Sequence, residues 1–156
     1  VRSIRYPGLI GHRSAPGGGT TDYAVEIYDY AVREAAYTCF LKADQALPMM
    51  YMDDAVRGTL ELMRAPKDQI RVRTSYNLGA MSFTPSEIGE CIRQQKPEFR
   101  LDYSPDQRQA IAESWPCSID DSAAKEDWGW QAEIMIEDMT NIMLDAMSTT
   151  NETLEP

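Results

Sequence analysis

Strand-like and helical segments alternate along this chain, and the alternation constrains its fold more than any single motif does. Between Ile70 and Leu78, every second position has a β-branched, aromatic or leucine side chain, and this alternation predicts a half-buried strand. Thr84-Pro85-Ser86-Glu87 then has the form of a capping box with proline at the first helical position, so a helix is predicted to follow. Strands that alternate with capped helices are typical of the α/β class.

Other segments fit the same alternation. Strands are predicted at 1–6, 39–41 and 99–103, and helices at 25–35, 53–65, 121–128 and 135–147, while 108–115 is helical or irregular. The chain opens at Val1 in what looks like a strand already under way, and few strands stand out. We therefore expect the closing part of a larger α/β fold. Residues 1–147 are predicted to be folded and 148–156 to be a disordered tail, because the tail is polar and has no periodic pattern.

Charge and composition exclude several classes of function. The net charge of −10 opposes nucleic-acid binding, which needs a basic surface to meet phosphates. The three cysteines are widely spaced and His12 is the single histidine, so neither a disulfide framework nor a metal site is predicted. No apolar run is long enough to predict a membrane span.

The motifs of a complete dinucleotide-dependent reductase are missing. Gly17-Gly18-Gly19 lacks both the spacing and the strand-to-helix context of a dinucleotide-binding turn. No tyrosine is followed by a lysine four residues later, so no catalytic residue is assigned to this chain. The glycine run is interpreted either as a flexible surface loop or as a loop that approaches a ligand closely.

Several blocks carry a family resemblance: RYPGLI at 5–10, PGGGTTDYA at 16–24, LPMMYM at 47–52, AMSFTP at 80–85, RQAIAESWP at 108–116 and the run 120–130. Together they resemble the C-terminal half of the threonine dehydrogenase family of extended short-chain dehydrogenases/reductases. The resemblance implies the end of a Rossmann sheet plus a small α/β substrate-binding lobe. It also implies oxidation of L-threonine to 2-amino-3-oxobutyrate, with NAD bound mostly by a missing N-terminal half that carries the catalytic Tyr and Lys.

Through the resemblance, Tyr6, Pro7 and Leu9 would lie on the nicotinamide side of the cofactor site; an ordinary strand-ending turn is the alternative. Gly17, Thr20 and Asp22 match the family's substrate loop, in which Asp22 would meet the threonine ammonium group. Helix capping is the alternative for Thr20 and Asp22, and the two interpretations are compatible with each other.

Trp115 would form a wall of the substrate pocket, and a buried core tryptophan is the alternative interpretation. The implied partners are L-threonine, an N-terminal half in cis or in trans, and a homodimer or larger assembly. The implied location is the mitochondrial matrix for a eukaryotic protein and the cytoplasm otherwise. A competing hypothesis is a non-catalytic accessory subunit of a larger mitochondrial assembly derived from this dehydrogenase.

Overall fold

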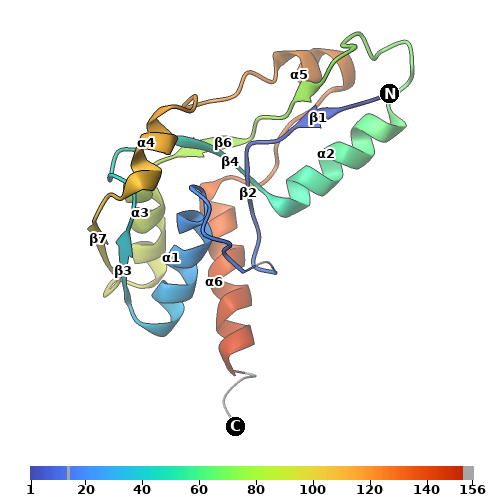
Figure 1. The fold of residues 1–156 in the computed structure, drawn as a ribbon. Coiled ribbons are helices and arrows are strands. Elements are labelled where there is room, and N and C mark those ends of the chain that lie inside the picture. The colour runs from blue at the N-terminus through green and yellow to red at the C-terminus, as the bar shows by residue number, and fades with distance from the viewer. Residues whose placement is uncertain (14, 153–156) are drawn as a thin grey trace.

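The computed structural model describes residues 1–13 and 15–152, which fold as an α/β protein (Figure 1). The helices are α1 Tyr23–Arg33, α2 Met52–Arg64, α3 Pro85–Gln95, α4 Gln107–Glu113, α5 Ser122–Trp128 and α6 Ile136–Glu152. The strands are β1 Ile4–Arg5, β2 Gly8–Ile10, β3 Ala36–Cys39, β4 Leu47–Tyr51, β5 Tyr76–Asn77, β6 Met81–Phe83 and β7 Arg100–Tyr103.

The strands form three small sheets. β1 pairs in parallel with β5, and β3 pairs in parallel with β7. β4 lies between β2, which is parallel to it, and β6, which is antiparallel to it. α2 lies between β1 and β5 in the chain, and these two strands are parallel, so the three elements form a β-α-β unit. The segment from β2 to β4 is inserted between β1 and α2.

Two apolar clusters hold the elements together. In the larger cluster, α1, α3 and α6 pack against one another beside the β3–β7 pair, in the lower part of Figure 1. In the smaller cluster, α2 and α5 meet the β1–β5 pair around the buried Trp130. A Cβ atom at Gly58 would lie 2.8 Å from Leu78 Cδ1 and 2.8 Å from Trp130 Cζ3, so glycine allows α2 to approach this cluster closely.

The capping box is confirmed. The Thr84 hydroxyl accepts a hydrogen bond from the Glu87 backbone N–H, and the Glu87 carboxylate accepts one from the Thr84 backbone N–H. α3 begins at Pro85, as the local sequence predicts. These contacts join residues within one helical turn, which is why a short sequence pattern is enough to predict them.

The strand predicted from Ile70 to Leu78 is wrong over most of its length, since only Tyr76 and Asn77 are in a strand. The backbone N–H of Arg71 donates to the Asp127 carboxylate, and that of Val72 donates to the Tyr76 hydroxyl. Side chains therefore satisfy these backbone groups, and no neighbouring strand is needed for them.

Other strands and helices also differ from the boundaries predicted from the sequence. Seven short strands are described, including β2 just after the predicted first strand and β4 in the apolar segment before α2. α6 continues to Glu152, so the first part of the predicted disordered tail is helical, and the Thr149 hydroxyl donates to the Asp145 carbonyl within it. Residues 153–156 lie outside the described residues.

Candidate functional site

The turn between β1 and β2 opens onto a pocket of about 310 Å³. Two of the predicted cofactor residues, Tyr6 and Pro7, line it together with the predicted substrate residue Trp115. The remaining lining residues are Gly8, Thr21, Pro48, Pro116 and Ile119. Residues that are far apart in the sequence thus share one pocket with proline and aromatic walls.

Glycine is required at position 8 by close packing. A Cβ atom there would lie 2.6 Å from Met49 Sδ and 2.8 Å from Thr21 Cγ2. β2 and the start of the α1 region can therefore approach each other only because position 8 lacks a side chain. This approach brings Thr21 to the pocket.

Tyr6 and Leu9 flank the turn differently. The Tyr6 hydroxyl is hydrogen-bonded to the Thr59 hydroxyl on α2, which orients the ring. Leu9 lies on β2 in register with Met50 and is not among the residues that line the pocket. Of the three predicted cofactor residues, the structure thus places Tyr6 and Pro7 at the pocket and Leu9 beside it.

The glycine loop is held by Asp22. Asp22 Oδ2 accepts hydrogen bonds from the backbone N–H groups of Gly17 at 2.6 Å and Gly19 at 2.8 Å. Although Asp22 occupies the N-cap position of α1, its side chain makes no capping hydrogen bond. Thr20 is buried between the loop and the helix. Capping by the Asp22 side chain, the alternative interpretation, is therefore not what the structure shows.

Trp115 follows α4 and is 42% exposed, so the alternative of a buried core tryptophan is wrong. α4 is anchored by the buried side chain of Gln109. Its Nε2 donates to Gln45 Oε1 at 2.8 Å, and its Oε1 accepts from the Lys42 backbone N–H at 2.8 Å. Gln109 thus supports the helix that precedes Trp115.

Sequence reasoning missed several pocket residues. Thr21 is adjacent to the predicted Thr20, and Pro48 and Pro116 lie inside blocks that carry the family resemblance. Their place in those blocks was the sequence signal that could have identified them as pocket residues. Ile119 lies between two such blocks and had no signal of its own.

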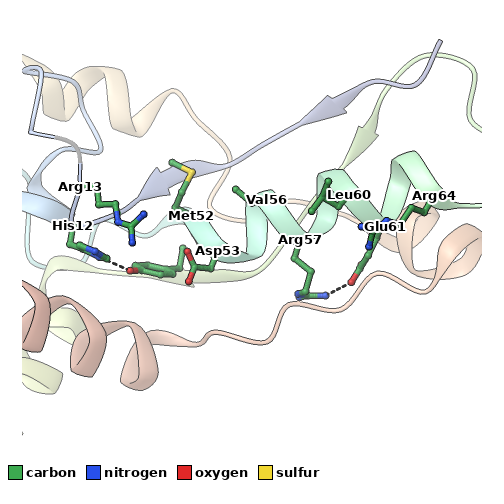
Figure 2. A pocket seen from close by; sticks show the side chains of 11 residues that line it. His12, Arg13, Met52, Asp53, Val56, Arg57, Leu60, Glu61 and Arg64 are labelled. Carbon is green, nitrogen blue, oxygen red and sulfur yellow. Dashed lines mark hydrogen bonds and ion pairs between the residues drawn. The ribbon is translucent and has the colours of Figure 1, made fainter.

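Two further pockets lie elsewhere. A groove of about 550 Å³ runs along α2, with the His12 ring hydrogen-bonded to the Tyr51 hydroxyl at 2.8 Å near one end (Figure 2). A pocket of about 440 Å³ beside β3 includes Tyr37 and Glu26. Burial and the hydrogen bond that Tyr37 donates to Glu26 raise the pKa of Tyr37 far above its ordinary value, so this phenol stays protonated.

Among residues 1–13 and 15–152, no cluster of three or more His, Cys, Asp or Glu side chains is arranged to hold a metal ion. Within that same part of the chain, no helix has the length and apolar character needed to cross a bilayer. The pocket at Tyr6 can enclose a small group between apolar walls, but its described lining residues offer neither a carboxylate nor an amine as a general base.

Comparisons with known proteins show which family the chain resembles in sequence and fold. The chain is 49% identical over 144 residues to the mitochondrial L-threonine 3-dehydrogenase of Bos taurus. It is homologous to the L-threonine 3-dehydrogenases, which are extended short-chain dehydrogenases/reductases. The match covers 92% of this chain and 38% of the bovine enzyme. No protein-family model matches the chain.

Solved structures of threonine dehydrogenases superpose closely on the chain. The holo form of the GalE-like L-threonine dehydrogenase from Cupriavidus necator is 59% identical, with a TM-score of 0.90, over 92% of this chain and 47% of that one. L-threonine dehydrogenase from Phytophthora infestans is 50% identical, with a TM-score of 0.93, over 96% of this chain and 48% of that one. The chain therefore has the fold of about half of a threonine dehydrogenase.

Proposed function

We propose that this chain supplies the substrate loop and the nicotinamide-side wall of an NAD-dependent L-threonine 3-dehydrogenase. The observation that carries the proposal is the pocket in which Tyr6, Pro7 and Trp115 meet. The homology to threonine dehydrogenases supports it. In this proposal the catalytic Tyr and Lys belong to the other half of the enzyme, in cis or in trans.

The pocket fits the nicotinamide end of the cofactor better than its phosphates. Its volume of about 310 Å³ and its proline and aromatic walls suit a planar ring next to a small substrate. The glycine run between β2 and α1 lacks the spacing of a dinucleotide-binding turn, and the N–H groups of Gly17 and Gly19 already donate to the Asp22 carboxylate. Most of the NAD would therefore be bound outside this chain.

The residues of this chain would bind and orient the substrate. Both hydrogen bonds to the glycine loop use Asp22 Oδ2, and we propose that Oδ1 of the same carboxylate meets the threonine ammonium group. Thr20 would hydrogen-bond the substrate, and Gly17 would let the loop approach it closely. Trp115 would exclude water from the reacting carbon. Bound NAD would supply the hydride acceptor for that carbon, and the hydroxyl proton would go to the tyrosine of the other half.

Complementation tests this proposal. The chain would be co-expressed with the N-terminal half of the Cupriavidus necator enzyme, and NADH formation with L-threonine would be followed. We expect the complex to be active and this chain alone to be inactive. Trp115→Ala should raise the KM for L-threonine about tenfold, since it removes a wall of the substrate pocket.

Ile111→Ala is the matched control, because Ile111 is an exposed apolar residue of α4 that does not line the pocket. It should leave KM unchanged. Activity of this chain alone, or an unchanged KM in Trp115→Ala, would contradict the proposal. A stable but inactive complex would instead support the accessory-subunit hypothesis. The bovine relative is named as mitochondrial, so for a eukaryotic source we also propose the mitochondrial matrix, and otherwise the cytoplasm.

A further inference from the structure

One loop forms a wall of the 310 Å³ pocket. Residues 114–121 join α4 to α5 and are called the pocket loop here. Three of them, Trp115, Pro116 and Ile119, line the pocket, while its other walls include the turn after β1 and Pro48 of β4. The width of the pocket therefore depends on where the loop is held relative to β1 and β4.

The pocket loop crosses between two sheets. β5 pairs with β1, whereas β6 belongs to the sheet of β2 and β4. β5 and β6 follow one another in the chain and are joined by residues 78–80. Figure 1 shows the pocket loop, in orange, running from α4 to α5 alongside β6 and β5. Contacts along this line fix the loop to both sheets.

The first contact comes from β5. Asn77 Nδ2 donates a hydrogen bond to the carbonyl of Asp120 at 3.0 Å. Asn77 is in register with Arg5 on the neighbouring strand β1, and Tyr6 and Pro7 follow directly. This amide therefore holds one end of the pocket loop in place relative to the strand that leads into two pocket residues.

The second contact comes from β6. The Ser82 hydroxyl donates to the carbonyl of Cys117, which follows Pro116. Ser82 is in register with Pro48 on β4. One hydroxyl thus ties the Trp115 end of the loop to the cross-strand neighbour of another pocket residue.

Between the two strands, the loop packs directly onto the backbone at Gly79. A Cβ atom there would lie 3.1 Å from the Ile119 carbonyl oxygen and 3.1 Å from the Asp121 carboxylate. The Gly79 carbonyl in turn accepts a hydrogen bond from Trp130 Nε1 at 2.9 Å, and Trp130 is fully buried. The surface to which the loop is attached is therefore anchored in the core.

We propose that Asn77 and Ser82 are positioning residues that hold the pocket loop across the two sheets and thereby set the side-chain size that the pocket accepts in a 2-amino-3-hydroxy acid. This inference rests on the proposed function. Neither side chain lines the pocket, so both act through Trp115 and Ile119. Without the two donors, the wall can move outward, and a longer substrate then fits while L-threonine is held less closely.

Mobility of the loop in this chain tests the first half of the proposal. Relaxation of ¹⁵N at the indole N–H groups reports on each tryptophan, and Trp115→Phe assigns the Trp115 signal. In Ser82→Ala and Asn77→Ala, the order parameter of the Trp115 indole should fall from about 0.85 to below about 0.6. The Trp130 indole, which is held by the Gly79 carbonyl, serves as the internal reference and should not change.

Matched variants separate the hydrogen bonds from side-chain volume. Ser82→Thr keeps the hydroxyl and should leave the Trp115 indole rigid. Asn77→Asp keeps the shape but lacks the N–H donor, so it should behave like Asn77→Ala. Thr38→Ala on β3 and Asn141→Ala on α6 are controls, because both residues are exposed and lie outside the pocket lining. Thermal unfolding checks the fold of every variant.

Substrate selectivity tests the second half. The complex with the co-expressed N-terminal half of the Cupriavidus necator enzyme would be assayed with L-threonine and with 2-amino-3-hydroxypentanoate, which is one methylene longer. In Ser82→Ala and Asn77→Ala, the preference for L-threonine in kcat/KM should fall about three- to tenfold, as expected for one lost hydrogen bond. The change should come from KM, with kcat within about twofold. A mere loss of folded protein would lower both rates equally and leave the ratio unchanged.

The outcomes distinguish this proposal from the proposed function. A Trp115 indole as rigid in Ser82→Ala and Asn77→Ala as in the unaltered chain would overturn it, and so would a substrate preference equal to that of Thr38→Ala. An active complex with an unchanged preference would leave the proposed function standing. An inactive complex of the unaltered chain would contradict the proposed function and the selectivity, while a mobile Trp115 in the variants would still support the anchoring of the loop.

Discussion

The carboxylate of Asp22 lies 2.6 Å from the backbone nitrogen of Gly17, five residues earlier in the chain, and accepts its hydrogen bond. The same oxygen accepts from the N–H of Gly19. One charged side chain thus closes the glycine loop onto the start of α1. The loop is shaped by this contact, and is not simply a flexible surface segment as one interpretation of the sequence had it.

Asp22→Ala should loosen the glycine loop while leaving the core intact. The Gly17 and Gly19 amides lose their acceptor, so their hydrogen exchange should become at least about tenfold faster. Because the loop is exposed, the free energy of unfolding should fall by no more than about 1 kcal/mol. Asp29→Ala is the control, since Asp29 makes only an exposed ion pair with Arg33. Equal exchange in both variants would show that Asp22 does not hold the loop.

Gly58→Ala should destabilise the contact between α2 and the smaller cluster. The added Cβ would lie 2.8 Å from atoms of Leu78 and Trp130, which are both fully buried. Overpacking of this kind costs about 1–3 kcal/mol, against about 1 kcal/mol that alanine gains over glycine in a helix. We expect a net loss of about 1 kcal/mol in denaturant unfolding. Gly17→Ala should be nearly neutral, since its nearest such atom is 4.0 Å away.

Asp54 joins α2 to the segment that leads into α6. Its buried carboxylate accepts from the backbone N–H groups of Glu133 and Ile134, both at 3.0 Å, and pairs with Arg57. Asp54→Ala removes these acceptors and should lower the free energy of unfolding by about 3 kcal/mol. The neighbouring Asp53 is exposed, so Asp53→Ala should change the free energy of unfolding by less than about 0.5 kcal/mol. Similar melting temperatures for the two variants would argue against this role.

Asp127 should make stability depend on pH in the acid range. Burial raises its pKa, but hydrogen bonds from Tyr76 and Arg71 outweigh burial and leave the pKa below the ordinary value. The unfolded chain therefore takes up this proton first as pH falls. The stabilisation is complete above the unfolded pKa of about 4 and is lost as pH falls through the folded pKa.

Asp127→Ala should accordingly cost about 3 kcal/mol near pH 7 and progressively less below about pH 4, as measured by denaturant unfolding at several pH values. Glu126→Ala is the control, because Glu126 is exposed and only 3.7 Å from Arg71 in a loose ion pair. A difference between wild type and Asp127→Ala that stayed constant down to acid pH would rule out this linkage.

Local signals predicted the helices well. The capping box at Thr84 placed the start of α3, and apolar residues at helical spacing identified α1, α2 and α6. Strands were harder to predict, because a strand is defined by its neighbours. The alternating pattern between Ile70 and Leu78 suggested a long strand, but Asp127 and the Tyr76 hydroxyl take up the backbone N–H groups of Arg71 and Val72.

The candidate site, like the strands, could be predicted only in part from the sequence. The family blocks named Tyr6, Pro7 and Trp115 from sequence, but their meeting in one pocket depends on the packing of β2 against Thr21 at Gly8. From the sequence, Trp115 could be interpreted either as a wall of the substrate pocket or as a buried core residue. The structure shows that its side chain is exposed. Leu9 carried the same kind of signal as Pro7 and lies on β2, outside the pocket lining.

By itself, the sequence determined the α/β class, the start of α3 and the resemblance to half of a threonine dehydrogenase. These depend on residues within a turn or two of each other, or on blocks preserved in order. Only the tertiary structure decided which strands pair, what Asp22 binds and which face of α2 stays exposed. Such features arise from contacts between residues far apart in the chain, and local spacing carries no information about which distant group will satisfy a backbone N–H or cover an apolar face.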